Sequence, residues 1–130
     1  MKNKRDRRVT RVQLDEGIKV VLCSIGSQTT FDLMTRDISI SGFFIEYDSP
    51  ARFPCSPSDV LEIWLQLTET EQVFFNGQVA RRVFSREDTG ADPAGIAIKI
   101  VKVDEKNERI LASFIHDKGL EIHKNSEIVA

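Results

Sequence analysis

The feature that most restricts the fold of this chain is a series of six short runs rich in β-branched and aromatic residues. Each run ends at residues that favour turns, and the alternation of apolar and polar side chains within several runs is typical of strands. The runs cover residues 17–25, 28–41, 42–47, 60–67, 73–84 and 96–103. Short strands at this spacing predict an all-β barrel or sandwich rather than a helical fold.

The segments between and after the runs give the rest of the layout. Residues 48–59 hold three of the four prolines, which predicts a long connection, and Gly77 predicts a bulge or bend in the fifth run. After the last run, Asp104 can cap a helix that ends before Gly119. The apolar residues of this predicted helix recur at three- and four-residue spacing; they are Ile110, Leu111, Phe114 and Ile115.

These patterns divide the chain into three parts. Residues 1–12 form a flexible basic arm, residues 13–118 form the β-domain with its helix, and residues 119–130 form a tail that adds a short strand, docks elsewhere or frays. At 130 residues, with 41% hydrophobic content, one core is expected. Because no apolar run reaches about 18 residues and no signal-peptide pattern is present, we expect a soluble cytoplasmic protein without a membrane span.

Charge is distributed unevenly along the chain. The first twelve residues carry six basic residues and one acid, a charge of +5, so the remainder carries −7 of the total of −2. An acidic body disfavours bulk binding of nucleic acid, while a basic arm attracts an anion to that end. The arm thus predicts a small anionic ligand better than a polyanion.

The residues that enzymes use most are sparse and badly placed. Cys23 and Cys55 lack the spacing of a metal or redox motif, and His116 and His123 have no carboxylates at ligand spacing. We expect two reduced structural thiols and two ordinary imidazoles. No nucleophile, base and orienting group can be assembled from this sequence, so it predicts neither an enzyme nor a cofactor.

Two motifs remain that could bind a ligand. In "RDISISG", the residues Asp37, Ser39 and Ser41 share one face of a strand, while Ile38 and Ile40 share the core face. Gly42 then predicts a bend or a place where something approaches the backbone. The arm contributes "RRVTR", with Arg7 and Arg11 four residues apart. A second Arg-x-x-x-Arg, at Arg82 and Arg86, shows how readily this spacing arises by itself.

The combination of "RRVTR", a strand, "DISISG", further strands and one terminal helix resembles the PilZ domain, whose members bind the bacterial second messenger cyclic di-GMP (c-di-GMP). The resemblance covers roughly residues 5–117. It implies a mainly β fold, a six-stranded antiparallel β-barrel with one C-terminal α-helix, and a noncatalytic receptor. It also implies a c-di-GMP site made of Arg7, Arg11, Asp37, Ser39 and Gly42, each of which matches the motifs. Secondary contacts are assigned to Arg8, Ser41, Arg81 and Arg82.

These residue types suit the ligand. A guanidinium can bind a phosphate or the O6/N7 edge of guanine through two hydrogen bonds and can also stack on a base. An ionised Asp37 accepts from the donor edge of guanine, and the Ser39 hydroxyl can donate or accept. Ordering residues 7–11 costs about 5 to 10 kcal/mol of backbone entropy, which ligand contacts must offset. We therefore expect the arm to be mobile without ligand and ordered with it.

That ordering would let the chain relay the ligand signal to an unidentified protein effector in motility, pilus formation, polysaccharide synthesis or regulation. Asp6, an acid beside the arginine motif, favours one ligand per chain over a stacked pair. Two alternatives stay open. The first is a PilZ-type adaptor that docks a partner without ligand. The second is a small barrel that stacks nucleic-acid bases, for which the aromatic candidates are Phe43, Phe44, Phe74 and Phe75, half of them expected in the core.

Overall fold

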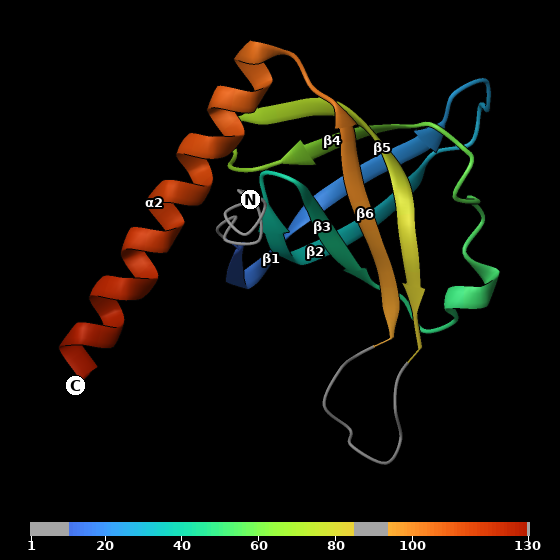
Figure 1. Ribbon diagram of the computed structural model, residues 1–130. Helices are drawn as coiled ribbons and strands as arrows, with labels where there is room; N and C mark the ends of the chain where they lie inside the picture. Colours follow the sequence, from blue (N-terminus) through green and yellow to red (C-terminus); the bar gives the residue numbers. More distant parts are fainter. Residues whose placement is uncertain (1–10, 85–93, 130) are drawn as a thin grey trace, which may run out of the picture.

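The computed structural model describes residues 11–84 and 94–129, with side chains as far as Gly119. Six strands form a closed antiparallel barrel in the order β1-β2-β3-β6-β5-β4, with one long helix against its side (Figure 1). The elements are β1 Arg11–Ser24, β2 Phe31–Ser39, β3 Gly42–Glu46, η1 Pro50–Arg52, β4 Leu61–Gln66, β5 Gln72–Val83, β6 Gly95–Lys102 and α2 Glu105–Val129. The predicted fold class is therefore confirmed, and the choice between barrel and sandwich is resolved by closure between β1 and β4.

The core follows directly from the alternation in the strands. In β4, Leu61, Ile63 and Leu65 are fully buried, while the residues between them are half-buried. Burying each such side chain stabilises the fold by about 1.5 to 3 kcal/mol relative to leaving it in water. Leu111 and Phe114 of α2 are also buried against the barrel, so the helix is part of the core rather than an appendage.

Strand β1 begins six residues earlier than its sequence pattern predicts. Arg11 pairs with Ser39 and Val12 pairs with Ile38 across β1 and β2. Val12 is 3% exposed, so the last two residues of the predicted arm belong to the barrel. The pairing register then shifts between Gln13 and Ile18, where β1 has extra residues opposite β2.

The core assignment of Ile40 is wrong. Ile38 is buried as predicted, but Ile40 is 42% exposed. Strand β2 ends at Ser39, and Ile40 and Ser41 form the short turn into β3. Because strand alternation holds only while the strand continues, the parity argument fails one residue past its end.

The terminal helix begins where predicted and continues further. The Asp104 carboxylate accepts the Asn107 backbone N–H at 2.7 Å, which is an N-terminal cap. The Asn107 side-chain oxygen in turn accepts the Phe74 N–H at 3.0 Å and ties the helix to β5. The predicted end at Gly119 and the separate tail are wrong, because α2 runs to Val129 and past the barrel (Figure 1).

Gly119 lies inside the helix without ending it. A glycine inside a helix costs only about 1 kcal/mol relative to alanine, so it does not by itself end the helix. A Cβ atom at Gly119 would lie 3.9 Å from Cγ1 of Val12. The helix therefore passes close to β1 at this position and continues.

The other turn predictions hold. Residues 48–59 connect β3 to β4 and contain only the short η1 helix. The β5–β6 register shifts between Asn76 and Gly77, which confirms the predicted bulge. A Cβ atom at Gly77 would lie 2.7 Å from the Ile63 side chain and 2.8 Å from the Lys99 carbonyl oxygen, so the crossing of β4, β5 and β6 needs glycine there.

The described residues also bear on the expectations for the cysteines, for metal ligands and for membrane helices. Cys23 and Cys55 are buried free thiols, and burial raises the pKa of both, which keeps them protonated. Residues 11–84 and 94–129 contain no group of His, Cys, Asp and Glu side chains arranged to hold a metal ion. Over the same residues, no helix has both the length and the hydropathy needed to cross a membrane.

Candidate ligand site at the β2–β3 turn

A hollow of about 240 Å³ lies on the outside of the barrel, where the start of β1 meets the end of β2 and the start of β3. Strands β5 and β6 form its other wall. Its polar lining residues are Arg11, Asp37, Ser39, Ser41, Arg81 and Lys99, and Gly42 lies among them. The fold thus brings four of the five predicted primary site residues to one place.

Asp37 reaches this hollow because of a bulge in β2. Thr35 pairs with Ile45 and Asp37 pairs with Phe44, so β2 has one residue more than β3 between these pairs. In a regular strand Thr35 and Asp37 would share a face. Instead Thr35 points into the core and is 1% exposed, while Asp37 lines the outer hollow.

Arg11 forms the central ion pair of the site with Asp37. Its Nε donates to Oδ1 of Asp37 at 3.1 Å, and its Nη2 donates to Oδ2, so both carboxylate oxygens are engaged. The hydrogen bonds and the negative charge of Asp37 raise the pKa of Arg11. The Arg11 side chain is 66% exposed and that of Asp37 is 18% exposed. The Asp37 carboxylate is therefore mostly covered by protein, and it holds the exposed Arg11 guanidinium in place.

The pair leaves hydrogen-bonding capacity on both partners. A guanidinium has five N–H donors, and Asp37 takes two of them. Three donors and the planar face of Arg11 remain for an anion or a base. A carboxylate has about four acceptor positions, so Asp37 can hold Arg11 and still accept from another donor.

Ser39 acts locally on the turn. Its hydroxyl accepts from the backbone N–H of Ser41 at 3.2 Å and lies 3.2 Å from the Gly42 carbonyl and 3.1 Å from the Ser41 hydroxyl. Ser39 is 6% exposed. Its single proton is shared among turn acceptors, so in this structure Ser39 shapes the β2–β3 turn rather than presenting a free donor.

Gly42 gives room to a neighbouring strand. An added Cβ atom would lie far inside contact distance of the Ile98 carbonyl oxygen and 3.2 Å from Cα of Lys99. The sequence predicts close approach to the backbone at Gly42, and β6 is what approaches. Space for a ligand is therefore not required to explain this glycine.

The two adjacent arginines of β5 have different roles. Arg81 is exposed and lines the hollow. Arg82 does not reach it: its Nε donates to the Pro50 carbonyl at 2.9 Å, and its Nη2 donates to the carbonyls of Cys55 at 2.9 Å and Phe53 at 3.4 Å. The assignment of Arg82 as a secondary anion contact is replaced by a structural one, since it holds the proline-rich loop.

Lys99 is the lining residue that the sequence reasoning missed. It pairs with Gly42 of β3 and with Gln78 of β5, which places it beside the motif. A lysine between isoleucines in a largely apolar strand was a signal in the sequence. Nothing in the sequence indicated which strand would lie beside Lys99, because β3 and β6 are far apart in the chain.

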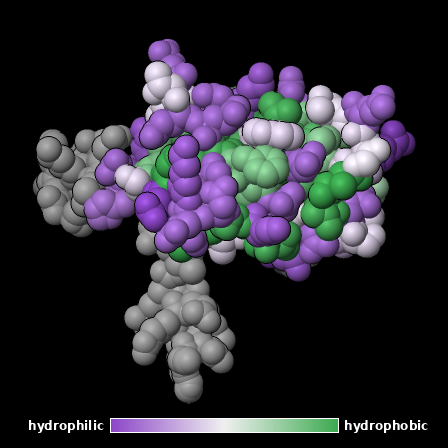
Figure 2. Space-filling view, turned by 90° about the horizontal axis from the view of Figure 1, so that it is seen from above, coloured by the Kyte–Doolittle hydropathy of each residue, from purple (hydrophilic) through white to green (hydrophobic). Residues whose placement is uncertain are grey.

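The four phenylalanines divide as expected. Phe43 and Phe75 are buried with their ring centroids 6.0 Å apart, and Phe44 and Phe74 are half-buried. Phe74 packs against Trp64 at a centroid distance of 5.1 Å. The face seen from above in Figure 2 is largely hydrophilic, with apolar residues in separate groups. No row of exposed aromatic rings is formed by these four residues.

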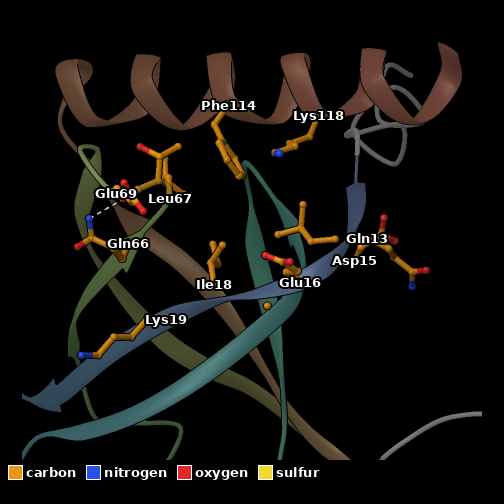
Figure 3. Close-up of a pocket in the computed structure, with 13 residues that line it drawn as sticks. Gln13, Asp15, Glu16, Ile18, Lys19, Gln66, Leu67, Glu69, Phe114 and Lys118 are labelled. Atoms are coloured by element: carbon orange, nitrogen blue, oxygen red, sulfur yellow. Dashed lines mark hydrogen bonds between the residues drawn. The ribbon is translucent and has the colours of Figure 1, made fainter. Parts of the chain in front are cut away.

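A larger hollow, of about 580 Å³, lies elsewhere. It is bounded by the irregular segment of β1, the β4–β5 turn and α2, and Phe114 and Lys118 point into it from the helix (Figure 3). Asp15, Glu16 and Glu69 line it with Lys19 and Lys118, so its charges are mixed. The motif residues from Asp37 to Gly42 do not line it, and we assign the candidate site by chemistry rather than by size.

Arg7, Arg8 and Asp6 lie outside the described residues, as does Arg86. The same holds for the side chain of His123. His116 is exposed on α2. The structure therefore places Arg11, the last arginine of "RRVTR", at the hollow and describes the strand from Arg11 onward.

Comparison with known proteins agrees with the fold and with the resemblance to the PilZ domain. A family model described as PilZ domain matches residues 3–117. The chain therefore belongs to the PilZ domain family, a family that binds c-di-GMP and whose members are generally noncatalytic receptors. No curated protein matches the sequence significantly.

Several solved structures share the fold. The PilZ domain of YcgR from Escherichia coli with c-di-GMP is 16% identical, with a TM-score of 0.62 over 93% of this chain and 97% of that one. The MrkH–c-di-GMP complex of K. pneumonia is 16% identical, with a TM-score of 0.72 over 92% of this chain and 54% of that one. MotI/DgrA of Bacillus subtilis, an inhibitor of motility, is 13% identical, with a TM-score of 0.67 over 88% and 52%. This chain spans about half the length of the last two.

Proposed function

We propose that this chain binds c-di-GMP through Arg7, Arg11, Asp37, Ser39 and Gly42 and relays the signal to a partner protein. The observation that carries the proposal is the ion pair of Arg11 and Asp37 at the edge of an open hollow. The family membership supplies the ligand class, and the exposed guanidinium supplies the group that can bind it.

The chemistry of the hollow fits a cyclic dinucleotide better than a simple anion. Arg11 keeps three N–H donors for a phosphate or a guanine edge, and Asp37 keeps acceptor positions for the guanine N1–H and amino group. Arg81 and Lys99 add positive charge on the opposite wall. A free phosphate would use the cations but would gain nothing from Asp37, so the carboxylate favours a base.

The size of the hollow supports participation of the arm. Pockets for drug-sized ligands hold about 300 to 1,000 Å³, and this one holds about 240 Å³. It therefore has room for only part of a dinucleotide. In the proposal, residues 1–10 cover the rest, with Arg7 as the other arginine of the motif and Asp6 limiting the site to one ligand per chain.

Ordering of that arm is the proposed output. Bringing positive charge onto an acidic body changes the shape and charge of one end of the barrel, which a partner protein can read. In the proposal, the protein signals to its partner in the cytoplasm. The partner recognises the surface that the ordered arm and the ligand form together.

The test is isothermal titration of the protein with c-di-GMP, with GTP and linear pGpG as controls. We expect saturable binding of the cyclic dinucleotide alone and no detectable binding for Arg11→Ala or Asp37→Ala. The matched control is Arg109→Ala, which removes another arginine–carboxylate pair, Arg109 with Glu105 on α2, away from the hollow. It should bind like the unmodified protein.

Each contrary result has a defined meaning. An unchanged isotherm for Arg11→Ala or Asp37→Ala would remove that residue from the site. Absence of binding by the unmodified protein would reject the receptor function and leave docking of a partner without ligand as the function of the domain.

A further inference from the structure

A buried hydroxyl lies behind the candidate site and belongs to neither motif. Thr35 is 1% exposed, and it is one of two buried polar residues, with Ser39, among those that the structure describes. It sits at the β2 bulge, two residues before Asp37 and on the opposite side of the strand.

The Thr35 hydroxyl connects both strands across the bulge. Its Oγ1 lies 2.6 Å from the Phe44 carbonyl oxygen in β3 and accepts the Asp37 backbone N–H at 3.3 Å. The Asp37 carbonyl lies at 3.1 Å. Because a hydroxyl has one proton, the shorter contact identifies the Phe44 carbonyl as its main acceptor. The hydroxyl therefore joins the two residues that pair beside the bulge.

The bulge determines where the Asp37 side chain points. The bulge reverses the facing of β2 between Thr35 and Asp37, so that Asp37 reaches the outer hollow. Asp37 then holds Arg11 through two hydrogen bonds. An exposed arginine has many rotamers, and only this carboxylate fixes it at the edge of the hollow among the contacts described.

We propose that Thr35 is a positioning residue for the ligand site: its buried hydroxyl holds the β2 bulge that turns Asp37 outward to orient Arg11. The proposal rests on the proposed c-di-GMP function for its effect on affinity. Its effect on the Arg11–Asp37 pair is independent of any ligand.

The hydroxyl can be separated from the volume of the side chain. Valine has nearly the shape of threonine but leaves the Asp37 N–H and the Phe44 carbonyl without this partner in a buried place. Serine keeps the hydroxyl and loses a methyl group, and alanine loses both. The Ser and Ala variants thus differ only in the hydroxyl, as do Thr and Val.

The experiment uses Thr35→Val, Thr35→Ser and Thr35→Ala with two readouts. The first is c-di-GMP affinity by titration. The second is the NMR signal of the Arg11 side-chain Nε–H in ligand-free protein, with Asp37→Ala marking the signal of an unpaired Arg11. Ile63→Val, a core change in β4 at a residue that does not line the hollow, controls for a general loss of stability.

We expect Thr35→Val to weaken binding at least tenfold and to shift the Arg11 signal toward that of Asp37→Ala. Thr35→Ser should stay within about threefold of the unmodified protein, and Ile63→Val should change neither readout. If Thr35→Val does not fold, the Ser and Ala variants decide the matter at lower temperature.

Two results would overturn the proposal. One is a folded Thr35→Val protein with unchanged affinity and an unchanged Arg11 signal. The other is failure of both Thr35→Val and Thr35→Ala to fold, which would make the hydroxyl a requirement of the barrel rather than of the site. If the unmodified protein binds no c-di-GMP, the proposed function fails, while the Arg11 signal still tests the role of Thr35.

Discussion

Arg11 and Arg82 are the same residue type in the same kind of sequence motif, and the barrel uses them in opposite ways. Arg11 is 66% exposed and makes its two hydrogen bonds to one carboxylate. Arg82 is half-buried and donates to three backbone carbonyls of the proline-rich connection between β3 and β4. One guanidinium faces outward with three of its five donors left, and the other makes three hydrogen bonds to the backbone of the chain.

The difference lies in the acceptors that each position meets. At Arg82 the acceptors are neutral backbone carbonyls of the proline-rich loop, and they hold the guanidinium against that loop. A single carboxylate holds the guanidinium from one side only. An arginine therefore indicates a binding site when its partner is a lone acid at an open hollow, and a structural anchor when its partners are backbone carbonyls.

The largest loss of stability is expected for Gly42, a motif residue that, like Arg82, serves the barrel rather than the ligand. Gly42→Ala would place a methyl group against the Ile98 carbonyl of the neighbouring strand, where backbone rather than a flexible side chain must move. Overpacking costs typically about 1 to 3 kcal/mol, and we expect the upper end of that range. Urea unfolding measures the loss. A stable Gly42→Ala protein that has lost only its affinity would show that this glycine serves the ligand instead.

Arg82→Met should come next. Removing the guanidinium leaves the carbonyls of Phe53 and Cys55 without this partner, at a cost of about 2 to 3 kcal/mol. The midpoint of urea unfolding should fall while c-di-GMP affinity stays the same.

Arg81→Met, the neighbouring exposed residue, is the matched control for Arg82→Met. It should leave the free energy of unfolding unchanged and weaken binding by a few-fold, since Arg81 lines the hollow. Equal effects of the two substitutions on both quantities would break the distinction between anchor and site.

Arg11→Met should show the reverse of Arg82→Met. The exposed pair with Asp37 contributes less than about 1 kcal/mol to stability, as surface ion pairs generally do. A charge-assisted contact to ligand contributes about 1.5 to 3 kcal/mol, so affinity should fall at least ten- to a hundred-fold. Titration and urea unfolding of the same sample decide this, and a large stability loss without a change in affinity would place Arg11 with Arg82.

The smallest effect on stability is expected for the N-terminal cap of α2, which belongs neither to the Arg11 site nor to the loop that Arg82 holds. Hydrogen bonds from the backbone and side chain of Asn107 lower the pKa of Asp104 from its ordinary value of 3.8. Because the folded pKa is depressed, the cap stabilises the protein above the unfolded pKa, and this contribution is lost as pH falls through the folded pKa. The stability difference between the unmodified protein and Asp104→Ala should therefore shrink below about pH 4.

Thermal unfolding across that pH range measures the cap difference. The affinity for c-di-GMP should not change in Asp104→Ala, since Asp104 contacts Asn107 rather than the hollow. A difference that grows as pH falls would contradict the assigned role of the carboxylate.

Much of the architecture could be read from local patterns. The six strands, the bulge at Gly77 and the cap at Asp104 follow from alternation, turn residues and side-chain chemistry, all of which act over a few residues. The motif residues Arg11, Asp37 and Ser39 could also be named, since the spacing of both motifs is visible in the chain. Ile40 and the end of the helix were predicted wrongly because those same local rules do not state where an element stops.

The sequence by itself determined that the chain forms six strands, which residues make up most of the core, and which ligand class the motifs resemble. The tertiary structure alone decided that Gly42 accommodates β6, that Arg82 holds the proline-rich loop, and that Lys99 stands beside the motif. It also decided that Thr35 and Asp37, which share a parity in sequence, lie on opposite sides of β2. The physical reason is that a bulge, a strand neighbour and a set of carbonyl acceptors come from pairing between distant segments.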